Sequence, residues 1–307
     1  MSAPVGRFAP SPTGRMHAGN IYAALACWLL VKSQGGSIVL RIEDLDRERS
    51  KPEHIDDVQR DFESLGLFWD KGPYFQSTRD NVYEEAFQAL SQTHSVYPCF
   101  CTRASLHAAS APHRGEKFVY PGTCRSLTAD ERAERATEKA PAWRVEVPDS
   151  KISFTDLIQG PYKQNLATDC GDFVIKRSDG AFAYQLAVVV DDAEQGITHV
   201  VRGMDLLCST PQQMFLQQAL GYKTPEYAHI PLMVAERDRR LSKRDKDASL
   251  EQLLQRFKTP EAIIGHIAGI SGLAKTTEPA RPEELLDSFS LDAYKARIAD
   301  PVQVQWR

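Results

Sequence analysis

The stretch RFAPSPTGRMHAGN, residues 7–20, is the strongest indication of how this chain folds. It overlaps the short apolar segment VGRFA at 5–9, which predicts a buried strand, and it runs into the Ala-rich stretch NIYAALACWLLVKSQ, which predicts a helix. A second strand, SIVLRIED at 37–44, follows. The opening is therefore a βαβ unit, which predicts a parallel sheet with a right-handed crossover. Ligands bind at the carboxyl ends of such strands, where the quoted stretch lies.

The parallel-sheet pattern returns in the second half of the chain. THVVRG at 198–203 predicts a strand, a helix is expected near 210–220, and the apolar run IPLMVA at 230–235 closes the pattern. Between the two halves lies a cysteine cluster followed by a polar helix candidate at 128–139. This middle part also holds three strand-like segments, WRVEV, FVIKR and QLAVVVDD. We interpret it as an insertion between the halves of the sheet.

These patterns predict an α/β protein with a Rossmann-like doubly wound parallel sheet, an inserted zinc-binding α/β subdomain and a small C-terminal helical region. The first half of the sheet domain is expected at 1–98 and the insertion at 99–195. The second half, with a basic loop, is expected at 196–247, and the helical region at 248–307.

The composition of the chain excludes several classes of function. The 307 residues are 42% apolar and 25% charged, enough for a full core, and the net charge of −4 excludes a global cationic field that attracts nucleic acid. No apolar run approaches a membrane span, and the first residues lack the apolar region of a signal peptide, so we expect a cytoplasmic protein without membrane contact. A G-x-x-x-x-G-K-S/T phosphate loop is absent, which disfavours a kinase.

Three loops carry candidate chemistry. In residues 7–20, small side chains and backbone N–H groups between a strand and a helix suit a phosphate. The segment Arg41-Ile-Glu-Asp-Leu-Asp46 puts three carboxylates and an arginine at the ligand-binding sheet edge, where paired acids can hold an ammonium group. The run Arg237–Lys246 has six cations and two acids in ten residues and can reach a pyrophosphate, although basic runs also form solvated faces or RNA patches.

The cysteine cluster is a candidate zinc site. Cys99 and Cys101 have the tight spacing that a tetrahedral zinc accepts, and Cys124 can add a third thiolate. The nearby options for the fourth ligand are His107, His113 and Tyr120. The alternative is three free thiols in a small packed subdomain. A closed four-ligand site would have a structural role.

These motifs, in this order, resemble those of one family. Arg7-Phe-Ala-Pro-Ser-Pro-Thr-Gly followed by His17-Ala-Gly-Asn20 is similar to the opening of the class I glutamyl-tRNA synthetases, with Asn20 replacing the last residue of their His-Ile-Gly-His signature. Asn20 can donate a hydrogen bond but carries no positive charge. Arg240-Leu-Ser-Lys-Arg244 resembles the class I Lys-Met-Ser-Lys-Ser loop. The resemblance covers nearly the whole chain, most strongly 5–46 and 180–247.

The resemblance implies that glutamate is activated with ATP as an adenylate, with Mg²⁺ accompanying ATP, and then passed to an RNA. The implied glutamate-binding residues are Arg7, Ala9, Ser11, Glu43, Tyr184 and Arg202. The implied ATP-binding residues are Pro10, His17, Gly19, Asn20, Leu241, Ser242 and Lys243, of which His17, Asn20 and Lys243 are the catalytic set. The implied ligands of one structural zinc ion are Cys99, Cys101, Tyr120 and Cys124.

Two of these residues favour glutamate over glutamine. Arg7 and Arg202 can clamp a side-chain carboxylate between them. A neutral amide could not offset the desolvation of two guanidinium groups, so a glutamine site would have little reason to bury both.

The length of the chain indicates which RNA receives the glutamate. The sequence after Arg244 suffices for a small helical domain but not for an anticodon-binding domain, and a compact chain of this length has a radius of gyration of ~19 Å, too short to touch both ends of one tRNA. This arrangement resembles the glutamyl-queuosine tRNA(Asp) synthetases, paralogues that attach glutamate to queuosine in the anticodon loop of tRNA(Asp). The expected partners are therefore L-glutamate, ATP and that loop, with the chain acting as a monomer.

Two alternatives share these motifs. A short conventional glutamyl-tRNA synthetase would charge the acceptor end of tRNA(Glu) with the same activation site. A catalytically idle RNA-binding paralogue would explain Asn20, but the intact Glu43, Arg202 and Lys243 argue against it.

Overall fold

The computed structural model describes residues 3–46, 48–102, 119–235, 239–240, 249–299 and 301–303. Leu241, Ser242 and Lys243 of the basic loop, and the alternative zinc ligands His107 and His113, lie outside these residues.

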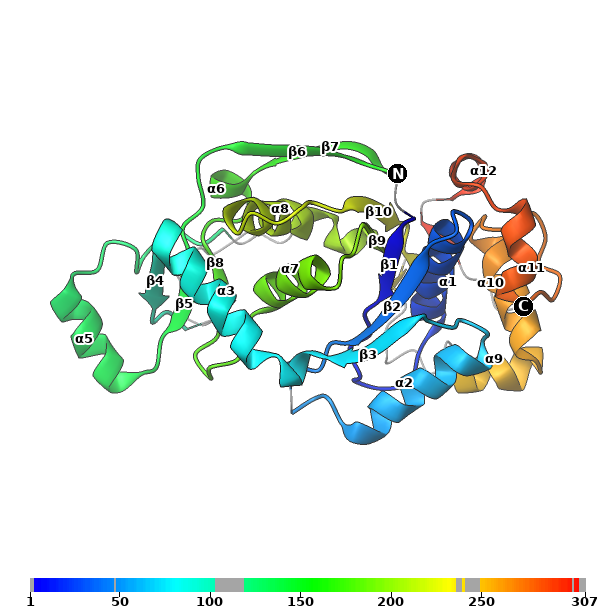
Figure 1. The fold of residues 1–307 in the computed structure, drawn as a ribbon, viewed down its shortest axis with the longest axis horizontal. Coiled ribbons are helices and arrows are strands. Elements are labelled where there is room, and N and C mark those ends of the chain that lie inside the picture. The colour runs from blue at the N-terminus through cyan, green and yellow to red at the C-terminus, as the bar shows by residue number, and fades with distance from the viewer. Residues whose placement is uncertain are drawn as a thin grey trace.

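A central parallel sheet confirms the predicted fold class. Strands β1 (Val5–Phe8), β2 (Ser37–Ile42) and β3 (Lys71–Phe75) pair in parallel, as do β9 (His199–Gly203) and β10 (Glu226–Ile230). The Thr198 N–H donates to the Val5 carbonyl at 2.9 Å, which joins the two pieces. The strand order across them is therefore β3-β2-β1-β9-β10, with the second half of the chain continuing the sheet that the first half begins (Figure 1).

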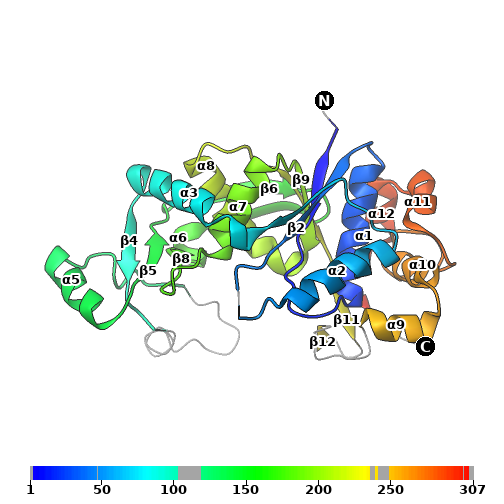
Figure 2. The ribbon, with the colours of Figure 1, turned by 60° about the horizontal axis from the view of Figure 1, so that its bottom comes forward.

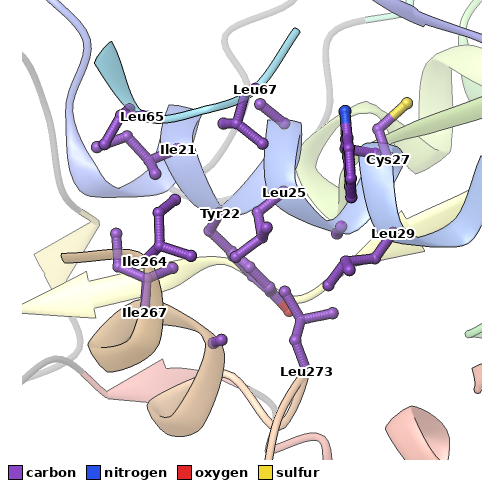
Figure 3. Packing of buried hydrophobic residues seen from close by; sticks show 14 of the residues in the cluster. Ile21, Tyr22, Leu25, Cys27, Leu29, Leu65, Leu67, Ile264, Ile267 and Leu273 are labelled. Carbon is purple, nitrogen blue, oxygen red and sulfur yellow. The ribbon is translucent and has the colours of Figure 1, made fainter. Parts of the chain in front are cut away.

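Helix α1 (Ala18–Lys32) is buried almost all round because it lies between the sheet and the C-terminal helices. Its residues Tyr22 and Leu25 face Ile264 and Ile267 of α10 (Figure 3). On the sheet side, a Cβ added to Gly6 would come within 2.6 Å of the Val31 side chain. Glycine in β1 is therefore what lets α1 approach the sheet so closely.

Three more helices connect or cover the strands of this domain. They are α2 (Pro52–Ser64), α3 (Asp80–Thr93) and α8 (Thr210–Ala219).

The segment QLAVVVDD is a helix, so its interpretation as a strand was wrong. Helix α7 (Tyr184–Glu194) contains it, and its residues from Leu186 to Asp192 are all buried. An element buried on every side shows no polar face, so a short apolar run does not reveal whether its period is that of a helix or a strand. Valine favours strands only weakly, and packing decides the outcome here.

The insertion contains a small antiparallel sheet of β4 (Val96–Cys99), β5 (Ala142–Val145) and β8 (Phe173–Lys176). Helix α5 (Ala129–Glu138) stands at the end of the molecule (Figures 1 and 2), and none of its residues is buried. A hairpin of β6 (Lys151–Asp156) and β7 (Gly160–Asn165), followed by the short α6 (Leu166–Asp169), returns toward the main sheet. The Leu157 N–H donates to the Tyr227 carbonyl at 2.8 Å, which fastens this hairpin to β10.

The C-terminal helices gather at the opposite end from α5 (Figures 1 and 2). They are α9 (Leu250–Phe257), α10 (Pro260–Ile270), α11 (Pro282–Leu285) and α12 (Leu291–Arg297). A small sheet of β11 (Met233–Ala235), β12 (Arg239–Arg240) and β13 (Val302–Gln303) accompanies them. Within the described part of the chain, no helix has the length and apolarity needed to cross a bilayer.

Candidate active site

A cleft of about 620 Å³ opens at the carboxyl ends of β1, β2 and β9. This is the edge where a parallel sheet binds its ligands. Most of the predicted glutamate- and ATP-binding residues meet there. Those that line the cleft are Arg7, Ala9, Pro10, Ser11, Asn20, Glu43, Tyr184 and Arg202.

His17 and Asn20 form the start of α1. The Gly19 N–H donates to His17 Nδ1 at 3.1 Å, and the His17 N–H donates to Asn20 Oδ1 at 3.2 Å. This reciprocal arrangement is a capping box, which satisfies backbone donors at the helix terminus. Asn20, the departure from the family signature, therefore has a structural role in addition to lining the cleft.

A buried carboxylate fixes the turn before α1. Asp61 of α2 accepts from the guanidinium of Arg15 at 2.6 and 3.2 Å and from the Met16 N–H at 3.2 Å. The Leu250 N–H also donates to the Met16 carbonyl, at 2.9 Å. The residues that directly follow the basic loop are thus attached to the turn that precedes α1. The roles predicted for Leu241, Ser242 and Lys243 stay predictions.

Arg7 is a buried cation with weak hydrogen bonds. Its side chain is 5% exposed, its Nη1 lies 3.4 Å from the Val201 carbonyl, and its Nε is 3.5 Å from Asp192 Oδ1 without forming a hydrogen bond. Asp192 is held more tightly by Arg41, at 2.8 Å. Arg7 consequently has hydrogen-bonding capacity left for a ligand in the cleft.

Glu43 lines the same cleft as the predicted partner of the substrate ammonium group. Burial raises the pKa of the Glu43 carboxyl above its ordinary value, although the guanidinium groups of Arg41 and Arg7 lower it. Arg41 Nη2 lies 3.4 Å from Glu43 Oε1. The Glu43 carboxylate is therefore oriented by a buried cation.

Asp44 does not reach the cleft, in contrast to the expectation that three carboxylates gather at this edge. Its carboxylate accepts from the Ser77 N–H at 2.8 Å and from Ser77 Oγ at 2.6 Å, which holds the short helix Gln76–Thr78. Successive side chains along an extended segment point to opposite faces, so Glu43 and Asp44 cannot serve the same site.

Asp191 and Asp192, two acids behind the cleft, were not among the predicted site residues. Asp192 pairs with Arg41, while Asp191 accepts from Arg79 at 2.7 Å and from the Tyr83 hydroxyl at 3.0 Å. The signal was present in the sequence as two acids at the end of an apolar run. Interpreting that run as a strand concealed it, because the helix is what turns both carboxylates toward the arginines.

Acidification should weaken glutamate binding through Glu43. Because its pKa is raised, the carboxylate charge is present above that raised pKa and is lost as the pH falls through it. As the pH falls, we expect the KM for glutamate to rise while the pH is still above about 4.3, where free glutamate keeps its own side-chain charge. Steady-state pyrophosphate exchange between about pH 8 and 5 measures this, a range that lies above the ordinary pKa of a free glutamate side chain. Glu43→Gln is the control and should show a high, flat KM; a wild-type KM that stays constant across the range would contradict the prediction.

The cysteine cluster has the geometry of a tetrahedral zinc site. Cys101 Sγ lies 3.6 Å from Cys124 Sγ, and the Tyr120 hydroxyl lies 3.5 Å from Cys99 Sγ and 3.9 Å from Cys101 Sγ. Ligand distances of about 2.3 Å for sulfur and 2.0 Å for oxygen imply S–S and S–O separations of ~3.5 to 3.8 Å. The three thiols and the tyrosine therefore fit one zinc ion.

Neighbouring groups favour a negative charge on one of these ligands, Cys99. The Cys124 N–H donates to the Tyr120 hydroxyl at 2.9 Å, and the Arg144 guanidinium lies 3.8 Å above the Tyr120 ring. Burial opposes ionisation of the Cys99 thiol, but hydrogen bonds with Tyr120 and Arg144 outweigh it and lower the pKa of Cys99.

Comparisons with known proteins agree with the fold and the cleft. Residues 5–299 match the family described as tRNA synthetases class I (E and Q), catalytic domain, so the chain belongs to that family and is an ATP-dependent ligase.

Individual relatives indicate which members of this family the chain resembles. The glutamyl-Q tRNA(Asp) synthetase of Symbiobacterium thermophilum is 46% identical over 97% of this chain and 95% of its own length. That of Thiobacillus denitrificans is 47% identical, over 93% and 91%. Among solved structures, a glutamate tRNA ligase from Elizabethkingia meningosepticum in complex with its amino acid has a TM-score of 0.83 and 29% identity, covering 99% of this chain and 67% of that one.

Proposed function

We propose that this chain activates L-glutamate with ATP and transfers it to the queuosine base in the anticodon loop of tRNA(Asp). The observation that carries the proposal is the combination of a cleft lined by Arg7, Glu43 and Arg202 with near full-length similarity to glutamyl-Q tRNA(Asp) synthetases. Identity to these relatives is 40–48%, well above the 29% shared with the glutamate tRNA ligase structures.

In the first step the α-carboxylate of glutamate attacks the α-phosphate of ATP in line, and pyrophosphate leaves. Glu43 holds the substrate ammonium group, while Arg7 and Arg202, with Tyr184, hold the side-chain carboxylate. The turn from Pro10 to Asn20 receives the nucleotide, and Lys243 neutralises charge on the leaving pyrophosphate. Mg²⁺ would accompany ATP and would neutralise phosphate charge.

In the second step a hydroxyl of the acceptor attacks the carbonyl of the adenylate, and AMP leaves. Catalysis of both steps depends mainly on positioning and charge neutralisation. Cys99, Cys101, Tyr120 and Cys124 would hold one zinc ion, which would tie β4 to the segment that precedes α5. The role of the ion would be structural, because protein side chains would supply all four ligands.

Labelled glutamate tests the acceptor directly. Purified protein is incubated with ATP, labelled glutamate and one of three RNAs: tRNA(Asp) with queuosine, tRNA(Asp) without it, and tRNA(Glu). The label is then mapped by nuclease digestion and by its lability to mild alkali. We expect label only on queuosine-containing tRNA(Asp), within the anticodon loop.

Two results would separate the alternatives. Label on the 3′ end of tRNA(Glu) would identify a conventional glutamyl-tRNA synthetase and refute the queuosine acceptor while leaving glutamate activation intact. Absence of glutamate-dependent pyrophosphate exchange would refute glutamate activation itself.

A further inference from the structure

Behind Arg202 lies a buried pair, Asp156 and His229, that has no place in the proposed chemistry. We infer that these two are positioning residues, which hold the Arg202 guanidinium so that one N–H of each terminal nitrogen faces the cleft and selects a carboxylate. This inference rests on the proposed function, since it assigns the device that sets the preference for glutamate.

The pair is fully enclosed. The exposed fraction is 0% for His229 and 1% for Asp156. His229 Nδ1 lies 2.6 Å from Asp156 Oδ2, and Arg202 Nε lies 3.0 Å from His229 Nε2. A guanidinium has only donors, so His229 Nε2 must accept, and the single imidazole proton must lie on Nδ1, where it is donated to Asp156.

Asp156 is held as a carboxylate, which fixes this tautomer. Its oxygens also accept from the backbone N–H groups of Ile158 at 3.0 Å, Gln159 at 2.9 Å and His229 at 3.1 Å. Burial opposes ionisation, but the hydrogen bonds from His229 and the backbone outweigh it and hold the pKa of Asp156 below its ordinary value. An ionised carboxylate can only accept, so the His229 proton stays on Nδ1.

The contacts of Arg202 divide into short and long ones. The short ones lie behind the cleft: Nε to His229, Nη1 to Gln213 Oε1 at 2.8 Å and Nη2 to Thr210 Oγ1 at 2.8 Å. The long ones involve residues that line the cleft: Nη1 to the Tyr184 hydroxyl at 3.5 Å and Nη2 to the Leu206 carbonyl at 3.4 Å.

The remaining donors therefore form a fork toward the cleft. One weakly engaged N–H on each terminal nitrogen is the arrangement that a carboxylate accepts in bidentate fashion. All partners of Arg202 are neutral, and within the described residues no carboxylate lies within 4.0 Å of its guanidinium. A bound carboxylate would thus meet an uncompensated charge, whereas a glutamine amide would leave it unpaired.

Three variants test whether His229 acts through Arg202. His229→Phe keeps the ring but removes the acceptor for Arg202 Nε. His229→Gln keeps an acceptor, because the Oε1 of the new side chain can occupy the place of Nε2. In Asp156→Asn the new amide can donate to Nδ1, which moves the imidazole proton to Nε2, where it opposes the Arg202 donor.

In glutamate-dependent pyrophosphate exchange we expect His229→Phe and Asp156→Asn to raise the KM for glutamate by about tenfold to a hundredfold. The KM for ATP should change by less than about twofold, and the ratio of kcat/KM for glutamate over glutamine should fall by a similar factor to the rise in KM. His229→Gln should restore most of both values. Asp156→Asn provides the test if His229→Phe does not fold.

Several outcomes would overturn the inference. One is an unchanged KM for glutamate in both disruptive variants; another is an equal rise in the KM values for glutamate and ATP, which would indicate a general structural effect. Failure of His229→Gln to restore selectivity would also count against it. Wild-type protein without glutamate-dependent exchange would instead refute the proposed function and the inference together.

Discussion

Replacing Arg7 with glutamine should lower kcat/KM for glutamate in pyrophosphate exchange by about 10²- to 10³-fold. Arg7 is buried at the edge of the cleft, and within the described structure the only hydrogen bond of its guanidinium is the long one to the Val201 carbonyl. The Arg7→Gln variant would leave a bound carboxylate with half of its predicted cationic clamp. Exchange kinetics at saturating ATP measure the loss.

A matched arginine controls for damage to the buried ion network. Arg79 donates a hydrogen bond to the Asp191 carboxylate, but it does not line the cleft. Arg79→Gln should lower the melting temperature and leave the KM for glutamate within about threefold of the wild-type value, because it removes no contact with the substrate. Equal losses of kcat/KM in the two variants would mean that Arg7 acts through stability and not through contact with glutamate.

Replacing Cys99 and Cys101 with serine should remove zinc and strongly reduce RNA transfer while sparing glutamate activation. The two thiols belong to a small hydrophobic cluster with Tyr97, Tyr120 and Cys124, separate from the main core. Loss of the metal should unfold this cluster locally, because a metal site of this kind stabilises the structure around it. We expect zinc to fall from about one ion per chain to near zero and transfer to tRNA to fall by more than about tenfold.

The measurements are metal analysis, pyrophosphate exchange and labelled transfer on the same preparations. Cys170→Ser is the matched control: Cys170 lies in the same part of the chain, but its thiol is directed to the Leu166 and Gly171 carbonyls and does not belong to the cluster. That variant should keep both zinc and transfer. Wild-type protein without zinc, or a double variant with undiminished transfer, would contradict the structural role proposed for the metal.

The sequence predicted the motifs better than it predicted the groups that support them. The family resemblance grouped Arg7, Glu43 and Arg202, and the strand pattern agreed with it, because each stands in or directly after a segment expected to be a parallel strand, and the ends of such strands meet at one edge. The zinc ligands could be grouped because two of them are two residues apart. Neither inference required knowledge of how distant segments pack.

Other features depend on contacts between segments far apart in the chain. The helical state of Leu186 to Asp192 is set by burial on all sides, so the local pattern was ambiguous. Asp44 turns away from Glu43 because it meets Ser77. The pairing of Asp156 with His229 spans 73 residues and depends on the docking of a hairpin on β10.

Local pattern was enough to indicate which strand ends carry the cleft, because this property follows from the geometry of a parallel sheet. Which charges are compensated could be learned only from the folded chain. Arg41 is neutralised by Asp191 and Asp192, whereas the partners of Arg202 among the described residues are all neutral, which would leave its charge for a ligand. That difference arises from packing of α7, α8 and β10, which bring together groups that no local pattern connects.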